Sequence, residues 1–235
     1  MALEFDIGTQ NKVVVGNVGG LHLTIACWVK TSYSDANNRP LINKGYTSHT
    51  APYYQYFLYV AANTGVAGGN VTVGGTLYNL EGGSAISDGI WHSVVLTYDG
   101  ETIRLYRDTT EVASNSNPSG NISQYATDAH IAGFTNLSGS AYSFTGLIDD
   151  MRIYNRALSV AEIQAIYRLR GSDNIVHGLV GRWMLNEKHD GATATVASSI
   201  IDISGQGNHG TPYNSPVYRE SVLRKRGGMS ILVLY

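Results

Sequence analysis

The chain has 235 residues, of which 14% are charged and 27 are glycine, and its formal net charge is -2. A charged fraction well below the roughly 25% of an average soluble protein, together with abundant glycine, is typical of a chain with many tight turns and little helix. So small a net charge creates no field that would attract nucleic acid or an anionic membrane, and we expect neither as a partner.

The N-terminal segment MALEFDIGTQNKVVVG lacks the basic stretch and the long apolar run of a secretory signal peptide. No run of apolar residues reaches the length of about 18 that a membrane-spanning helix needs. We therefore expect a soluble chain that is synthesised in a cytoplasm. The single cysteine, Cys27, lies in the apolar run LTIACWVK and is expected to be buried as a small hydrophobic residue.

Short apolar runs recur along the chain at the spacing of β-hairpins, with Gly, Asn and Asp turns between them. In chain order they are KVVVG, LHLTIACWVK, RPLINKG, YYQYFLYVAA, NVTVGGTLYNL, IWHSVVLTYDG, ETIRLYRD, TEVAS, DAHIAGF and SFTGLIDDMRIYN. Such a pattern predicts an all-β protein with two antiparallel sheets packed as a sandwich or jelly roll.

The aromatic run YYQYFLYV is the strongest candidate for a ligand-binding strand. If side chains alternate along it, Tyr54 and Tyr56 lie on one face and Phe57 and Tyr59 on the other. Tyrosine combines apolar area with a polar tip, so Tyr54 and Tyr56 are candidates for stacking on a sugar or docking a protein. The alternative is a strand that is covered on both faces.

The run WHSVVLTY alternates more clearly. His92, Val94, Leu96 and Tyr98 form its more apolar face and are expected to point into the core. The following Asp-Gly pair at 99–100 suits a tight hairpin turn. At the next turn Thr109 is β-branched and resists the left-handed conformation, so we expect a longer connection there.

One short helix is predicted near residues 160–170. Ser159 and Glu162 form a capping box, apolar residues follow at helical spacing, and Gly171 ends the pattern. With so little other helical pattern, the helix is expected to plug one end of the sandwich.

Several of these segments, taken in order, resemble the laminin G-like, concanavalin A-like lectin/glucanase superfamily of jelly rolls. They are LEFD, LTIACWVKTS, LINKG, DGIWHSVVLTYDG, LYRD and FTGLIDDMRIYNRALSVAEIQAIY, and together they span about residues 2–168. The resemblance implies two antiparallel sheets, a concave face that binds glycans or proteins in some members, and often a structural calcium ion.

The same resemblance extends beyond the helix, where GLVGRWMLNE and DISGQGNHGT look like the opening strands of the family, displaced to residues 178–214. We therefore divide the chain into a jelly roll over 1–171 and strands over 172–218. These strands complete the same sandwich in a permuted order or complete a neighbouring subunit by strand exchange. A truncated second domain is a third option, with a marginal core.

Residues 219–235 read as a basic linker followed by an apolar C-terminal arm. The arm residues are Arg224, Lys225, Arg226, Ile231, Leu232, Val233, Leu234 and Tyr235. An apolar, β-prone segment left free would be an aggregation hazard, so we expect the arm to be buried in its own domain or in a partner.

The carboxylates of the chain do not form a catalytic pattern. Retaining glycosidases need two carboxyl groups about 5 Å apart, and no E-x-D-x-E run is present. Asp149 and Asp150 are adjacent on a predicted strand, so they would point to opposite faces. The resemblance instead implies that Asp6, with Asp149 or Asp150, helps to hold calcium, although Lys12 stands where an acidic ligand is usual. The alternative is that these carboxylates bond to backbone and turns.

We therefore expect a non-enzymatic protein whose only cofactor would be a structural calcium ion. The first hypothesis is a structural component of a virion, such as a phage capsid decoration or accessory protein. It would lie on the capsid surface and contact the capsid or symmetry-related subunits of a homo-oligomer. The alternative is a carbohydrate-binding adhesion or receptor-recognition module whose partner is a cell-surface glycan. A glycoside-processing enzyme is the least favoured of the three.

Overall fold

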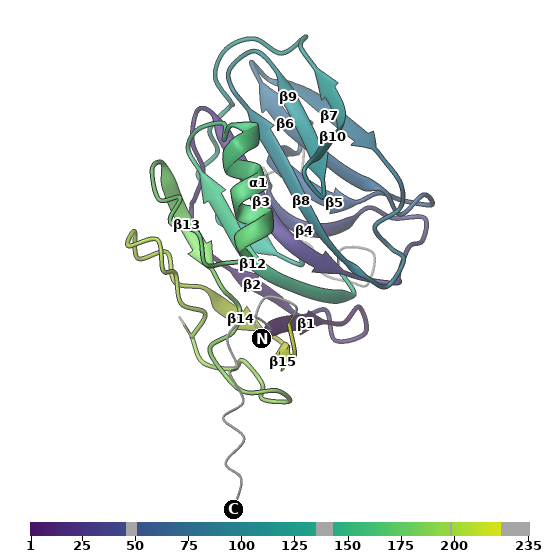
Figure 1. The fold of residues 1–235 in the computed structure, drawn as a ribbon, viewed down its shortest axis with the longest axis vertical. Helices are drawn as coiled ribbons and strands as arrows, with labels where there is room; N and C mark the ends of the chain where they lie inside the picture. Colours follow the sequence, from purple (N-terminus) through teal and green to yellow (C-terminus); the bar gives the residue numbers. More distant parts are fainter. Residues whose placement is uncertain (46–50, 135–142, 198, 222–235) are drawn as a thin grey trace, which may run out of the picture.

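The computed structural model describes residues 1–45, 51–134, 143–197 and 199–221, which form a two-layer β-sandwich (Figure 1). We call the larger layer sheet A. Its strand order is β10-β9-β8-β3-β12-β1-β15, with β13 also paired to β12. The bounds are β1 Ala2–Phe5, β3 Leu23–Lys30, β8 Trp91–Tyr98, β9 Ile103–Arg107, β10 Thr110–Asn115, β12 Gly146–Tyr154, β13 Leu179–Trp183 and β15 Val217–Arg219.

The second layer, sheet B, has the order β14-β2-β11-β4-β5-β6-β7. Its bounds are β2 Lys12–Val14, β4 Arg39–Gly45, β5 Tyr54–Val60, β6 Ala67–Val73, β7 Thr76–Gly82, β11 Ala129–Ile131 and β14 Thr211–Tyr213. The pairings between neighbouring strands of both sheets are antiparallel. The predicted all-β jelly-roll sandwich is thus confirmed.

The main core lies between the two sheets, where each strand turns its apolar face inward. Val94, Leu96 and Tyr98 of β8 belong to it, as their alternation predicts. Cys27 of β3 is buried in the same core, and this burial raises the pKa of its thiol well above the usual range. The cysteine is therefore a packing residue and not a reactive thiol.

Helix α1 spans Val160–Leu169 and begins with the predicted capping box between Ser159 and Glu162. The expectation that it plugs one end of the sandwich is wrong. Its buried Ile163 and Ile166 pack on Ala26 and Val95, which point outward from sheet A, so the helix covers the outer face of that sheet (Figure 1). Among the described residues, no helix combines the length and the apolar composition needed to span a membrane.

The turn between β9 and β10 is also tighter than expected. Arg107 pairs directly with Thr110, and Asp108 and Thr109 both take positive φ, 49° and 77°. The Asp108 carboxylate stabilises this turn, because it accepts a hydrogen bond from the Ser93 amide over 3.0 Å and contacts His92 Nδ1 at 2.7 Å. Tertiary bonds therefore outweigh the conformational preference of threonine.

The strands after the helix are built into both sheets of the same chain. β13 pairs with β12, β15 with β1, and β14 with β2 (Figure 1). Trp183 of β13 is fully buried in the main core, and its Nε1 donates to the Asn208 carbonyl over 2.8 Å. Arg219, which the sequence suggested as part of a linker, is the last residue of β15 and pairs with Glu4 at 2.7 Å. The arm residues from 224 to 235 lie outside the described residues.

Candidate functional site

The aromatic strand β5 contains a β-bulge that reverses part of its alternation. Lys44 pairs with Tyr56 and Gly45 with Tyr54, so Gln55 is an extra residue on β5. Tyr54 consequently joins Phe57 on the outer face of sheet B. Tyr56, which the sequence placed beside Tyr54, is instead fully buried in the main core, and its hydroxyl donates to the Val18 carbonyl over 2.9 Å. It is not available to contact a ligand.

Four aromatic side chains gather on this outer face, and we call them the outer aromatic cluster. The Phe57 ring lies at their centre, with centroid distances of 4.9 Å to Tyr54, 4.5 Å to Tyr59 and 5.2 Å to Phe134. Tyr59 lies against Gly68 of β6, where an added Cβ would come within 2.2 Å of the tyrosine ring. The cluster therefore depends on a glycine in the neighbouring strand.

Beside this cluster is a hollow of about 310 Å³, which we call the outer-face pocket. Its volume lies at the small end of the range of roughly 300–1,000 Å³ found for ligand sites. Three of its residues are cross-strand neighbours, because Phe57 pairs with Asn70 and Asn70 with Asn79. The described residues that line it are Asn37, Asn38, Tyr54, Phe57, Asn70, Leu77, Asn79 and Phe134.

Asn70 is the most unusual residue of this pocket. It lies in the middle of β6 and only 2% of the residue is exposed, yet its Oδ1 has no hydrogen-bond partner. A buried polar atom without a partner costs about 1–3 kcal/mol, so such atoms are rare in folded proteins. A ligand that brought a donor to this oxygen would remove that cost.

The other amides of the pocket lie closer to solvent. Asn37 and Asn79 are exposed, while Asn38 is partly buried and its Oδ1 accepts a hydrogen bond from the Ala62 amide over 2.8 Å. Each asparagine amide offers both donors and acceptors. The pocket thus combines aromatic and aliphatic walls with amide groups at its base and rim.

The described side chains that line the pocket carry no charge at neutral pH. Two carboxylates lie two residues from the lining in the chain. Glu81 accepts a hydrogen bond from the Tyr59 hydroxyl of the outer aromatic cluster over 3.0 Å, and Asp35 accepts one from the Asn37 amide over 3.0 Å. Asp35 is engaged by Arg39, whose Nε donates to it over 3.0 Å, and this hydrogen bond lowers the pKa of Asp35. The carboxylate is therefore neutralised by an adjacent guanidinium.

The three residues implied for calcium are not brought together. Asp6 is exposed, and its Oδ1 accepts hydrogen bonds from the amides of Gly8 at 2.6 Å and Thr9 at 3.1 Å, so it stabilises its own turn. The register of β1 against β12 pairs Phe5 with Gly146 and Leu3 with Ile148. Continuing this register places Asp149 opposite Ala2, roughly 13 Å along the strand from Asp6 at about 3.3 Å per residue.

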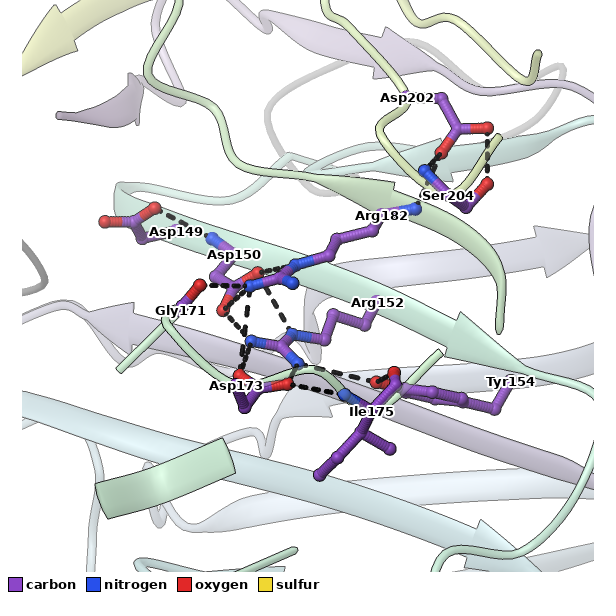
Figure 2. A network of polar contacts seen from close by, with 10 residues as sticks. All are labelled: Asp149, Asp150, Arg152, Tyr154, Gly171, Asp173, Ile175, Arg182, Asp202 and Ser204. Atoms are coloured by element: carbon purple, nitrogen blue, oxygen red, sulfur yellow. Dashed lines mark hydrogen bonds and ion pairs between the residues drawn. The ribbon is translucent and has the colours of Figure 1, made fainter. Parts of the chain in front are cut away.

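Asp150 is also held in a way that does not suit calcium (Figure 2). It sits in a bulge of β12 with φ of 45°, and its carboxylate accepts hydrogen bonds from Arg152 Nε over 3.0 Å and Arg182 Nε over 2.9 Å. Two guanidinium groups occupy the space that a cation would need. Asp173 accepts a further bond from Arg152 Nη1 over 2.7 Å, which completes a buried ionic network.

The neighbouring Asp149 points away from Asp150 in Figure 2 and accepts a hydrogen bond from the Asp150 amide over 2.8 Å. Burial raises its pKa well above the usual range. In the described part of the chain, no group of three or more His, Cys, Asp or Glu residues is arranged to hold a metal ion. The residues implied for calcium therefore do not fit that ion.

The family of the chain follows from its sequence as a whole. A family model described as the concanavalin A-like lectin/glucanases superfamily matches residues 8–164, which is more than half of the chain. The chain belongs to this superfamily. The predicted resemblance is thus confirmed, while among curated protein sequences none matches the chain.

Solved structures of lectin-like sandwiches share this fold. A candidate carbohydrate-binding protein from Bacteroides ovatus superposes with a TM-score of 0.61 at 16% identity, over 93% of this chain and 59% of that protein. The binding domain of Paraclostridial Mosquitocidal Protein 1 superposes with a TM-score of 0.51 at 15% identity, over 88% of this chain and 50% of that protein. Domains LG4-5 of the mouse laminin α1 chain superpose with a TM-score of 0.52 at 14% identity, over 68% of this chain and 43% of that protein. At these identities the likeness establishes the fold.

Most of the pocket residues of this lectin-like sandwich are absent from the sequence-based predictions, which named Tyr54 as the one ligand-binding candidate among them. One signal was available for Asn70 and Asn79. The Gly74-Gly75 turn between β6 and β7 fixes their register and sets the two asparagines opposite each other. No comparable local signal brings Phe134, Asn37 or Asn38 to the same place, because their positions depend on long-range packing.

Proposed function

We propose that this protein is a non-enzymatic, glycan-binding module and that the glycan binds in the outer-face pocket. The observation that carries the proposal is the meeting of aromatic rings and asparagine amides in one hollow on the outer face of sheet B. Tyr54 and Phe134 supply apolar walls, and Asn70 and Asn79 supply hydrogen-bonding groups beside them.

A sugar ring has the complementary chemistry. Its C–H faces are weakly positive and pack against the negative face of an aromatic ring, while its hydroxyl groups act as both donors and acceptors. Ligand sites in general combine apolar walls with a few placed polar groups. Tyr54 is partly exposed and stands at 4.9 Å from the Phe57 ring centre, so it is the aromatic residue best placed to meet an incoming sugar.

The comparisons support this reading in a general way. The Bacteroides ovatus protein that shares the fold is described as a candidate for carbohydrate binding, and the mosquitocidal protein shares it through a binding domain. A hydrolytic role has less support, because the described residues that line the pocket include no carboxylate. Glycoside hydrolysis ordinarily requires two of them.

The role as a virion component has no support from these comparisons. Its capsid partner, its homo-oligomer and its place on a capsid surface remain predictions from the sequence. The arm from 224 to 235, on which that hypothesis mainly depended, lies outside the described residues.

The proposal is tested by screening the folded 235-residue protein on a glycan array and measuring the affinity of each hit by calorimetry. We expect Tyr54→Ala and Asn79→Ala each to weaken binding about 3- to 10-fold, which corresponds to the loss of one aromatic or one hydrogen-bonding contact. Both residues are at least partly exposed, so both variants are expected to fold.

Matched controls are Tyr213→Ala and Asn117→Ala. Tyr213 is 49% exposed on β14 at the opposite edge of sheet B, and Asn117 is exposed after β10 of sheet A. Both controls should leave the affinity unchanged. If no glycan binds to verified folded protein, or if the controls weaken binding as much as the pocket variants do, the proposal is wrong.

A further inference from the structure

The unpartnered Oδ1 of Asn70 indicates which kind of group the pocket binds. The oxygen is an acceptor, it is almost completely buried, and it belongs to a residue that lines the pocket. Asn70 is fixed by backbone pairing to Phe57 on one side and Asn79 on the other. The backbone position of Asn70 is therefore set before a ligand arrives, and a suitable ligand presents a hydrogen-bond donor to its Oδ1.

The surroundings of Asn70 restrict the donor further. Phe57, its cross-strand partner, is packed between aromatic rings, so the donor group must sit directly beside an apolar surface of the same ligand. A hydroxyl group on a sugar ring meets this requirement, since the ring carbons beside it supply the apolar surface. An ammonium group would also be a donor, but it would bring a charge.

A charged ligand is disfavoured because the charged groups near the described lining are already engaged. Lys12 Nζ donates to the Phe134 carbonyl over 2.9 Å, and Glu81 accepts a hydrogen bond from the Tyr59 hydroxyl over 3.0 Å. None of the described lining residues is ionised at neutral pH, and Asp35 near the rim is already paired with Arg39. An ion moved from water into such a site would lose hydration without gaining a partner.

We infer that the outer-face pocket selects an uncharged sugar unit and that Asn70 Oδ1 accepts a hydrogen bond from one hydroxyl of that unit. Asn70 is then the residue that determines specificity. This inference rests on the proposed function, because it names the class of glycan for the same pocket.

The first test changes the ligand and leaves the protein intact. The probes are the methyl glycosides of glucose, galactose and mannose and any neutral hit from the array, each compared with its uronic acid and its singly deoxygenated derivatives. We expect each uronic acid to bind at least about tenfold more weakly than its neutral parent. Among the deoxygenated sugars, one should bind about 10-fold or more weakly than its parent, because it lacks the hydroxyl group that donates to Asn70.

Salt provides an independent readout. Binding of an uncharged sugar should not change between about 0.01 and 1 M NaCl, although the Debye length falls from about 30 to about 3 Å over that range. A lysine at the rim should alter this behaviour. We expect Asn79→Lys to gain affinity for uronic acids and to make that binding salt-dependent, while Asn117→Lys, a matched change outside the pocket, should do neither.

The second test assigns the hydroxyl to Asn70. Asn70→Leu removes the acceptor with little change in size, so the critical deoxygenated sugar and its parent should bind it equally. Asn70→Asp keeps an oxygen acceptor at this position, so it should still bind the parent sugar more tightly than the critical deoxygenated sugar. The ligand series on the unmodified protein provides an answer even if Asn70→Leu does not fold.

The outcomes separate the two proposals. Binding of uronic acids as tight as that of the neutral sugars would overturn the inference and leave the proposed function standing. If the unmodified protein and Asn70→Leu distinguish the parent sugar from the critical deoxygenated sugar equally well, the assignment of that hydroxyl group to Asn70 is wrong. A complete lack of glycan binding would overturn the proposed function and the inference with it.

Discussion

Arg182 of β13 donates a hydrogen bond from Nε to Oδ1 of Asp150 on β12 over 2.9 Å, in a part of the protein that is almost closed to water. The same guanidinium donates from Nη2 to the carbonyl of Gly171 over 2.9 Å. A strand that follows the helix is thus fastened to the middle of sheet A by side chains as well as by backbone pairing (Figure 2).

Replacing Arg182 with methionine should lower the free energy of unfolding by about 3 kcal/mol, because it removes one partner from a buried ion pair. Urea denaturation measures the change. Arg219→Met is the matched control, since Arg219 and Glu4 form an ion pair that is about 40% exposed on both sides, for which we expect less than about 1 kcal/mol. Equal effects of the two substitutions would contradict the structural role of Arg182.

Gly68 is expected to be intolerant of even one added methyl group. In Gly68→Ala the new Cβ would meet the Tyr59 ring at 2.2 Å, so the ring must leave its place against Phe57. We expect a loss of about 1–3 kcal/mol in unfolding free energy. The double variant Gly68→Ala/Tyr59→Ala removes the clash, and a double-mutant cycle should therefore show strong non-additivity. Additive effects would mean that the two residues do not compete for the same space.

The capping box predicts a specific acid dependence. A hydrogen bond from Arg156 lowers the pKa of Glu162 to about 2, against 4.5 for the unperturbed group. Because the folded-state pKa is the lower one, the stabilisation by ionised Glu162 is fully present above pH 4.5 and is lost as the pH falls toward 2. The difference in unfolding free energy between the unmodified protein and Glu162→Gln should therefore shrink over that interval. A difference that stays constant with pH would disprove the assignment.

Lys44 should act in the alkaline range, and its contribution to stability should again rise with pH. Burial in β4 lowers its pKa to about 8, against 10.5 for the unperturbed group. Between these two values the unfolded chain holds a proton that the folded chain has lost, so the contribution of Lys44 to stability rises from pH 8 to 10.5. Subtracting the curve of Lys44→Met from that of the unmodified protein isolates this rise from the titration of buried tyrosines. A flat difference curve would show that Lys44 is accessible to solvent.

Features that depend on one strand or one turn of helix were predictable from the sequence. The inward face of β8 and the cap at Ser159 follow from local periodicity, which the structure preserves. The bulges were not predictable, because an extra residue in one strand is defined only against its partner. Gln55 and Asp150 both occupy such positions, and each changes the side of the sheet to which the neighbouring side chains point. This is why Tyr56 was assigned to the wrong environment.

The pocket required still more long-range information. Tyr54, Asn70 and Phe134 come from separate parts of the chain, and only the pairing of sheet B and the packing around Phe57 bring them together. Each residue taken alone looks like an ordinary strand or loop residue. The chemistry of the site arises from their combination.

The pairing of β1 with β15 has a consequence for how the protein is made. Glu4 and Arg219 are 215 positions apart, so β1 leaves the ribosome long before its partner has been synthesised. During that interval the edge of β1 that β15 will cover stays unpaired and is open to other chains. Closing so long a loop also slows folding. Sheet A can therefore reach its final form only after residue 219 has emerged.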